Sequence, residues 1–397
     1  MKTVSQKLGL ILTGGGARAA YQVGVLKAMT EFLPRHEKNP FPVICGTSAG
    51  SLNAITLAVN ADSFRKGVQY LMSIWRNSHT NQIYRTDWPG VLKNTALWLA
   101  GIIFSSIGRN RFSRISLLDN SPLAKLLRDT LPVGKLQEHI AGGLVHALSV
   151  TASGYASGHS VTFYQGVKSI RPWVRARRVG IPTRIDTRHL LASSAIPFVF
   201  PAVRINREYF GDGSMRQIAP ISEALHLGAT RILIIGVGQC KDTNTKRSNE
   251  VSYPSMAQIA GHVMNSIFLD SLEVDIERLH RINRTVAHLS EEAKKASGMH
   301  HVDELVIEPS QSIDKIAERY AKNLPRSIRF LLRFIGGMRE SGANLVSYLL
   351  FEQNFCNAMI ELGYQDALSR KDEILAFIQH TETPTVSAKL QASTLSK

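Results

Sequence analysis

The chain has 397 residues, of which 44% are hydrophobic, and a formal net charge of +16. Such a chain can bury a sizeable core, as one large domain with additions or as two domains. The positive charge favours anionic partners, which are nucleic acid, acidic lipid headgroups or phosphorylated substrates. No zinc-finger spacing and no aromatic-basic RNA-binding signature is present, so we expect no nucleic-acid partner.

Cysteine use and the N-terminus indicate where the protein resides. Three cysteines in so long a chain do not form a disulfide scaffold, and their spacing matches no metal site. The apolar run before the first glycines is too short for a secretory signal or a membrane span. We therefore expect a cytoplasmic protein, and the positive charge favours peripheral contact with anionic membranes.

The chain opens with two strand-helix units. Residues 8–13 (LGLILT) predict a buried strand, a three-glycine turn follows, and residues 18–33 carry apolar side chains at helical spacing. Residues 41–45 (FPVIC) predict a second strand, and residues 49–61 predict a packed helix. This order indicates an α/β fold whose sheet is mainly parallel, with helices on both faces.

The turn after the second strand reads Gly46-Thr47-Ser48-Ala49-Gly50. A strand, Gly-x-Ser-x-Gly and a helix form the context of a nucleophile elbow, in which a strained serine stands at the end of the strand. The glycines are needed because a side chain at either position would crowd the turn. The pattern predicts Ser48 as a nucleophile.

The glycine turn after the first strand has two interpretations. Its spacing, Gly14-x-Gly16-x-x-Ala19, fits the dinucleotide fingerprint of a nicotinamide-dependent oxidoreductase. That fingerprint needs an acid near the end of the second strand, where the Ser48 elbow stands instead. The same loop presents bare amides at a helix N-terminus, which suits an oxyanion hole, and Arg18 adds a positive charge beside it.

Residues 78–125 interrupt the alternation of strands and helices. Their apolar run, residues 96–107, is too short to span a bilayer. It is either a buried helix or an interfacial segment or lid over an apolar substrate site, and its tryptophans and arginines favour the interface. These aromatic and basic residues are Trp88, Trp98, Arg109, Arg111 and Arg114.

The second half of the chain is predicted to complete the sheet and then to become helical. Residues 231–237 (RILIIGV) are expected to close the sheet. We divide the chain into a domain at 8–240, with 78–125 as an insertion, a helical region at 255–380, and a disordered tail at 381–397. Three further strands are expected at 144–151, 161–165 and 205–210.

A serine nucleophile needs a base. Asp212 lies between two glycines at the end of a strand, in the sequence YFGDGSM. An aspartate within about 3 Å of the serine hydroxyl can act as the general base, and burial raises its pKa toward the useful range. The alternative is an ordinary Asp-Gly hairpin turn. No histidine lies in a distinctive turn, and His226 and His262 fall within helical patterns.

A basic amphipathic helix is predicted at residues 324–339. Arg326, Arg329 and Arg333 share one face, and the other positions are rich in leucine, isoleucine and phenylalanine. Such a helix either lies on an anionic membrane or packs in the core with its basic side in solvent.

Four blocks of the sequence together resemble the patatin-like phospholipases, which are lipid acyl hydrolases with a Ser-Asp dyad and no catalytic histidine. Their order and spacing agree with that family across about residues 8–240. The blocks are GGGARAAYQVGVL from Gly14, GTSAG from Gly46, ASSAIPFVFPAV at residues 192–203, and DGS from Asp212.

The resemblance implies a three-layer α/β/α fold with a mainly parallel central sheet. It implies an enzyme that hydrolyses fatty-acyl esters of phospholipids and needs no metal ion or other cofactor. The implied site residues are Ser48 as nucleophile, Asp212 as base, and Gly14, Gly15, Gly16 and Arg18 at the oxyanion hole, with Arg18 steadying that loop or a lipid phosphate.

The chain departs from the family pattern at Ala19, Ser214 and Gln217-Ile218, which bears on substrate preference more than on the chemistry. Two alternatives stay open at this point. One is the nicotinamide-dependent oxidoreductase, and the other is a membrane-associated scaffold that keeps the fold without activity. The headgroup, acyl position, chain length and oligomeric state are not specified by the sequence.

Overall fold

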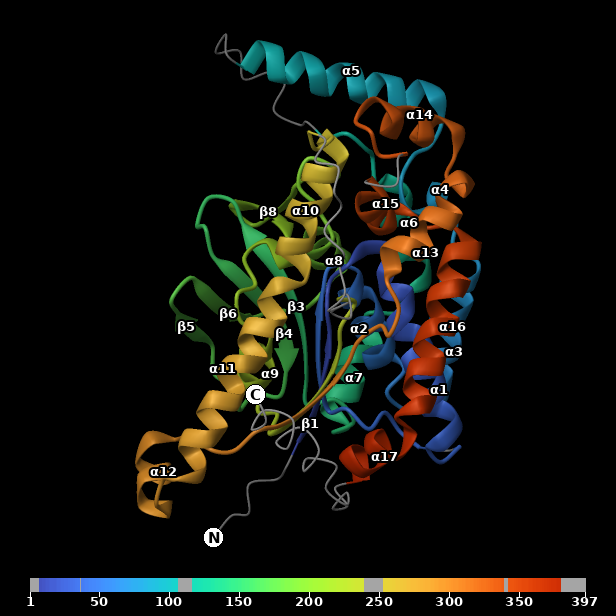
Figure 1. Cartoon of the computed structure of the whole chain (residues 1–397). Coiled ribbons are helices and arrows are strands. Elements are labelled where there is room, and N and C mark those ends of the chain that lie inside the picture. The colour runs from blue at the N-terminus through green and yellow to red at the C-terminus, as the bar shows by residue number, and fades with distance from the viewer. Residues whose placement is uncertain (1–6, 36, 106–115, 239–252, 339–341, 380–397) are drawn as a thin grey trace, which may run out of the picture.

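The computed structural model describes residues 7–35, 37–105, 116–238, 253–338 and 342–379, with side chains omitted from residue 99 to 105. The predicted tail at 381–397 lies outside the described residues. Figure 1 shows a central sheet between layers of helices, with the C-terminal helices covering one side.

The described strands and helices follow in chain order. The strands are β1 (Leu8–Leu12), β2 (Val43–Thr47), β3 (Ala147–Gly154), β4 (Ser160–Gly166), β5 (Trp173–Arg175), β6 (Arg178–Pro182), β7 (Val203–Ile205), β8 (Glu208–Asp212), β9 (Arg231–Ile235) and β10 (Asp303–Ile307). The helices up to the middle of the chain are α1 (Ala20–Phe32), α2 (Ala49–Val59), α3 (Phe64–Arg76), α4 (Thr80–Ile83), α5 (Trp88–Ser105), α6 (Ser121–Thr130), α7 (Gly134–Ala141), α8 (Thr187–Ser193) and α9 (Pro220–His226). The later helices are α10 (Met256–Phe268), α11 (Asp270–Ala287), α12 (Glu291–Ser297), α13 (Ile313–Tyr320), α14 (Arg326–Phe334), α15 (Ala343–Leu349), α16 (Gln353–Ser369) and α17 (Lys371–Gln379).

The strands form one mixed sheet whose central part is parallel. The order is β10-β9-β1-β2-β3, with every neighbouring pair parallel. Beyond β3 the sheet continues through β4, β6 and β5, and β4 runs antiparallel to β3. The carboxyl end of β3 also pairs with β8. The predicted α/β class and mainly parallel sheet are confirmed.

Two strand predictions were wrong in detail. Residues 231–237 were expected to close the sheet, but β9 lies between β1 and β10, so β10 is the outer strand. Strand β10 also lies within residues 255–380, which were expected to be helical. This strand is short and begins with Asp303 and Glu304, and an outer strand needs only alternate apolar residues, here Leu305 and Ile307.

The prediction of one strand at residues 205–210 was also wrong. They contain a hairpin turn between β7 and β8. Asn206 adopts a positive φ of 54° at that turn, a conformation that asparagine tolerates better than most residues. The hairpin matters for the site because it brings the end of β8 to β3.

The layers follow from the alternation of side chains along the strands. Leu10 and Leu12 point into the larger apolar cluster, which includes residues of α1, α2 and α16. Ile11 points to the opposite face, where it joins residues of α9 and α11. Because both faces of the parallel strands are covered, their sequences are almost continuously apolar.

Helix α16 belongs to the predicted C-terminal region but packs tightly on α1. A Cβ at Gly24 of α1 would lie 2.0 Å from the carbonyl oxygen of Ile360, and one at Gly363 of α16 would lie 2.1 Å from that of Tyr21. The two backbones therefore meet where glycines allow close approach. The C-terminal region is joined to the sheet domain through this contact and through β10.

Part of the insertion forms an exposed end of the molecule. Figure 1 shows α5 beside α14 at the top. Trp88 of α5 is 44% exposed and meets Phe330 of α14 edge-on at 5.5 Å between ring centroids. Arg109, Arg111 and Arg114 lie outside the described residues. Among the described helices, none is long and apolar enough to cross a membrane.

We predict that Gly363→Ala lowers the free energy of unfolding by about 1–3 kcal/mol, because the new methyl group forces α16 away from α1. Urea unfolding followed by circular dichroism measures the change. Gly134→Ala, at a helical position with no atom within 4 Å of the new Cβ, is the matched control. It should be neutral or stabilising by up to about 1 kcal/mol. Equal stability of the two variants would contradict the close α1–α16 contact.

Candidate active site

The predicted nucleophile and base meet at the carboxyl edge of the sheet. Ser48 follows β2 and Asp212 ends β8, and they are 164 positions apart in the chain. The Ser48 hydroxyl donates a hydrogen bond to Asp212 Oδ2 at 2.6 Å. In open α/β sheets this edge is where ligands bind.

Ser48 has the strained backbone of a nucleophile elbow. Its φ is +53° and its ψ is −131°, values that a residue with a side chain rarely adopts. A Cβ at Gly50 would lie 2.2 Å from the carbonyl oxygen of Leu12, and one at Gly46 would lie 2.6 Å from Ser51 Cα. Both flanking glycines are therefore required by contact, as the sequence predicts.

The buried side chain of Ser193 hydrogen-bonds to the backbone of the nucleophile elbow. The Ser48 amide donates to Ser193 Oγ at 2.8 Å, and the Ser193 hydroxyl donates to the Thr151 carbonyl at 2.6 Å. One buried hydroxyl thus links the nucleophile to β3. The resemblance placed the segment 192–203 near the site but did not indicate this role. The only sequence signal was a serine among small residues.

Asp212 is completely buried. Its Oδ1 accepts a hydrogen bond from the Ser214 amide at 2.9 Å, and its own amide donates to the Ala195 carbonyl. Burial raises the pKa of this carboxyl to about 7, against the smaller lowering effect of the hydrogen bonds from Ser48 and Ser214. The residue after Asp212 has to be glycine, because a Cβ at Gly213 would lie 2.1 Å from the Thr151 carbonyl oxygen.

The glycine loop lies against the nucleophile. A Cβ at Gly14 would lie 3.0 Å from Ser48 Cβ and 2.4 Å from Ser214 Oγ. Gly16 has a φ of +57°, and a Cβ there would lie 2.2 Å from the Tyr348 carbonyl oxygen. Within the described part of the chain, the amides of Gly14 and Gly15 have no hydrogen-bond acceptor. The amide of Gly14 therefore lies unpaired next to Ser48, and that of Gly15 follows it in the same loop.

The side chain of Arg18 turns away from the nucleophile and into the C-terminal helices. It is 1% exposed, and Nη2 donates to Asp314 Oδ1 at 2.7 Å and Asn344 Oδ1 at 2.8 Å. Nε donates to Ser347 Oγ, and the guanidinium covers the Tyr348 ring. A guanidinium buried and paired in this way steadies the glycine loop and is not exposed to a lipid phosphate.

The next question is whether a histidine contacts Ser48 or Asp212. Among the described residues, no histidine forms a hydrogen bond with Ser48 or Asp212. His226, considered from the sequence, stacks on Trp173 on the far face of the sheet. The described side chains also include no group of three or more His, Cys, Asp or Glu that could hold a metal ion.

A mostly apolar pocket adjoins Ser48, with about 340 Å³ of empty space that is partly open to solvent, and we call it the front pocket. Ser194 Oγ is buried at this pocket and has no partner within the described residues. The residues that line the front pocket are Gly16, Ser48, Ala49, Leu52, Ile83, Leu123, Ser194, Ile196, Phe200 and Phe351.

Comparison with known proteins identifies the family. A family model described as patatin-like phospholipase matches residues 10–225. The chain belongs to the patatin-like phospholipase family. Membership confirms the resemblance inferred from the four sequence blocks.

Two individual proteins are similar to this chain. A cGAMP-activated phospholipase of Pseudomonas aeruginosa is 26% identical over 217 residues, which are 55% of this chain and 55% of that protein. The chain thus matches about half the length of this curated relative. The crystal structure of VipD from Legionella pneumophila aligns with a TM-score of 0.35 and 13% identity, covering 93% of this chain and 67% of that one.

Proposed function

We propose that this protein is a serine-dependent lipid acyl hydrolase in which Ser48 is the nucleophile and Asp212 the general base. The observation that carries the proposal is the 2.6 Å hydrogen bond from the Ser48 hydroxyl to a fully buried carboxylate. Family membership supports the reaction class. The absence of a nearby histidine, among the described residues, leaves Asp212 as the group in position to take the proton.

In the proposed reaction, Ser48 Oγ attacks the ester carbonyl carbon while its proton moves to Asp212 Oδ2. The tetrahedral intermediate collapses, the bond to the alcohol oxygen breaks, and Asp212 returns the proton to the departing alcohol. Water then attacks the acyl-enzyme and gives a proton to Asp212, and Ser48 regains its hydroxyl proton as the fatty acid leaves. A pKa of about 7 suits both halves of this cycle.

The amides of Gly14 and Gly15 are the proposed donors to the oxyanion. They have no acceptor within the described residues, and Gly14 lies in contact with Ser48. Donors that are fixed before the reaction stabilise developing charge without reorganisation, and one such donor is typically worth about a hundredfold to a thousandfold in rate. Arg18 contributes by holding the loop through Asp314 and Asn344.

The proposed substrate is a phospholipid or a similar fatty-acyl ester. The front pocket supports this class because most of its lining beside Ser48 is aliphatic or aromatic. The buried and unpartnered Ser194 hydroxyl is available to hydrogen-bond the polar part of such an ester.

Peripheral contact with an anionic membrane is proposed for one end of the molecule. Helix α14 buries Ile328 and Leu332, yet its outer side exposes two aromatic residues, with Phe334 75% exposed. The Ala257 amide donates to the Ile335 carbonyl, so exposed Met256 of α10 adjoins this end. We call the surface made by Trp88, Met256, Arg326, Phe330, Arg333 and Phe334 the α5–α14 end.

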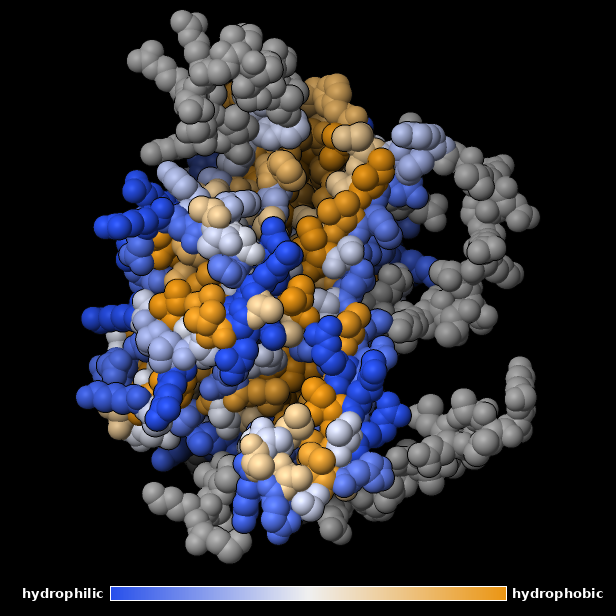
Figure 2. Space-filling view, turned by 90° about the vertical axis from the view of Figure 1, so that its left-hand side faces the viewer, coloured by the Kyte–Doolittle hydropathy of each residue, from blue (hydrophilic) through white to orange (hydrophobic). Residues whose placement is uncertain are grey.

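Aromatic and basic side chains at one exposed end can bury ring area in the lipid interface and attract acidic headgroups. Thr86, just before α5, accepts a hydrogen bond from Ser327 of α14. Ile83, three residues earlier, lines the front pocket. The α5–α14 end is therefore linked by a short segment to the site. Apolar residues also reach the surface along α10, and on that face Figure 2 shows them among hydrophilic residues.

We predict that Ser48→Ala and Asp212→Asn each lower kcat/KM for a chromogenic acyl ester by about a thousandfold or more, because nucleophile and base act as a unit. Ser149→Ala, which removes a buried hydroxyl from the neighbouring strand β3, is the control and should retain near wild-type turnover. Full activity in Asp212→Asn would refute the dyad. Inactivity of the wild type on every ester would favour the scaffold alternative.

The rate should depend on the ionisation of Asp212. Its pKa is raised from 3.8 to about 7, and the base is active only when deprotonated. We therefore expect kcat/KM to be level above pH ~7 and to fall about tenfold per pH unit below it, whereas an ordinary aspartate would stay active down to about pH 4. The pH dependence of kcat/KM is measured with an ester that has no ionisable group in this pH range. Full activity at pH ~5 would contradict the prediction.

Membrane contact predicts that Phe334→Ser weakens co-sedimentation with phosphatidylglycerol vesicles by about tenfold, because an exposed ring can bury in the interface. Arg333→Gln should weaken binding to these vesicles but not to neutral phosphatidylcholine vesicles. Val174→Ser, at an exposed position on β5, is the control and should bind like the wild type. Unchanged sedimentation of Phe334→Ser would exclude the α5–α14 end as the contact.

A further inference from the structure

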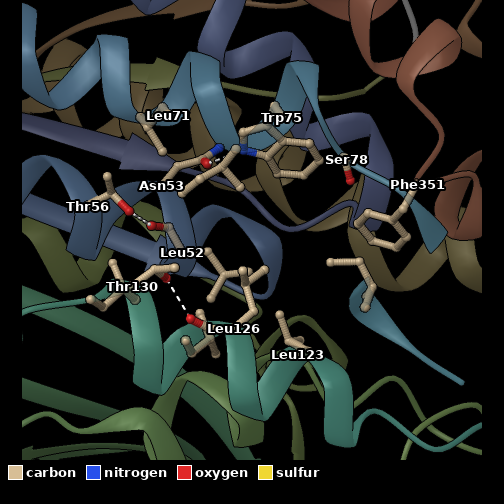
Figure 3. Close-up of a pocket in the computed structure, with 14 residues that line it drawn as sticks. Leu52, Asn53, Thr56, Leu71, Trp75, Ser78, Leu123, Leu126, Thr130 and Phe351 are labelled. Atoms are coloured by element: carbon tan, nitrogen blue, oxygen red, sulfur yellow. Dashed lines mark hydrogen bonds between the residues drawn. The ribbon is translucent and has the colours of Figure 1, made fainter. Parts of the chain in front are cut away.

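A second cavity lies behind the front pocket and has no part in the mechanism above. Its empty space, part of which is open to solvent, is about 510 Å³, and it is lined by residues of α2, α3, α4 and α6 together with Phe351 (Figure 3). We call it the rear cavity. Its walls include Leu52 of α2, Leu71 of α3, and Leu123 and Leu126 of α6, so they are mainly aliphatic.

The rear cavity has four polar side chains that form hydrogen bonds within the protein, namely Asn53, Thr56, Trp75 and Thr130, and Ser78 adds one further hydroxyl. The Thr56 hydroxyl donates to the Leu52 carbonyl at 2.7 Å, and the Thr130 hydroxyl donates to the Leu126 carbonyl at 2.6 Å. The Trp75 indole N–H donates to Asn53 Oδ1 at 2.8 Å (Figure 3). A ligand in this cavity would therefore find apolar contacts, which selects a hydrocarbon over a polar group.

Only a thin wall separates the rear cavity from the nucleophile. Four side chains line both spaces, namely Leu52, Ile83, Leu123 and Phe351. All four residues have apolar side chains, and rotation of such side chains between rotamers needs no unfolding of a helix. Phe351 stacks on Trp75 at 6.1 Å between ring centroids and thus spans the boundary.

We propose that the rear cavity receives the methyl-terminal part of the substrate's acyl chain while the ester lies at Ser48. The proposal rests on the proposed function and specifies its substrate class, which is esters of long, unbranched acyl chains. The positions of the two pockets support this proposal. An acyl chain bound at Ser48 would pass through the front pocket and then between the four residues that line both spaces. Each methylene that leaves water there contributes favourably to binding.

The C-terminal region supplies one side of this passage. Phe351 lies well beyond the residues that match the family model, which end at 225. Its segment is held in place where the Tyr84 hydroxyl donates to the Leu349 carbonyl at 2.9 Å and the Thr80 hydroxyl donates to the Phe351 carbonyl. Chain-length selection in this protein therefore depends on a part of the chain outside the shared family region.

The test uses p-nitrophenyl butyrate, decanoate and palmitate with the full-length protein. Leu126→Trp fills the rear cavity from a half-buried position, so it should keep butyrate hydrolysis and lower kcat/KM for palmitate at least tenfold. Lys125→Trp places the same side chain at an exposed position of the same helix and should preserve the wild-type preference for chain length. Leu126→Ala enlarges the cavity and should raise the palmitate-to-decanoate ratio.

Identical ratios of palmitate to butyrate hydrolysis in the wild type, Leu126→Trp and Leu126→Ala would overturn the assignment. If Leu126→Trp does not fold, the ratio in Leu126→Ala decides the question alone. Failure of the proposed function has a different signature, because the wild type would then hydrolyse none of the three esters, and the acyl assignment would fall with it.

Discussion

One fully buried hydrogen bond, between the Ser48 hydroxyl and Asp212, organises the candidate site. A carboxylate without solvent is a stronger base than one in water, and burial raises the pKa of Asp212 to about 7. The low local dielectric also strengthens the hydrogen bond itself. The elbow, Ser193 and the close backbone contact at Gly213 all serve to keep these two side chains together.

This arrangement has a conformational cost that the surrounding structure offsets. Holding a residue at a φ of +53° costs about 1–3 kcal/mol. Such a strained conformation persists only where the surrounding packing fixes the backbone. Here α15 contacts Gly16, and Arg18 joins the glycine loop to Asp314 and Asn344. The C-terminal helices are therefore part of the site's support, and Phe351 makes them part of its walls.

Sequence alone predicted the features that short-range patterns encode. Ser48, Asp212 and the glycine loop were singled out because tight turns need glycine, which leaves a visible signature. The role of Ser193, the partners of Arg18 and the outer strand β10 were missed because they arise from contacts between distant segments. The hairpin at Asn206 was missed because residues 205–210 resemble a single strand. The rear cavity has no local signature, since helices α2, α3, α4 and α6 and Phe351 form it together.

The central claim is that Ser48, Asp212 and the glycine-loop amides converge on one reacting carbon. A crystal structure of the protein after reaction with an alkyl fluorophosphonate tests this most directly, because the phosphonate mimics the tetrahedral intermediate. We expect a bond from phosphorus to Ser48 Oγ, a phosphonyl oxygen facing the amides of Gly14 and Gly15, and Asp212 beside the adduct. An adduct on another residue, or a phosphonyl oxygen that faces away from the glycine loop, would contradict it.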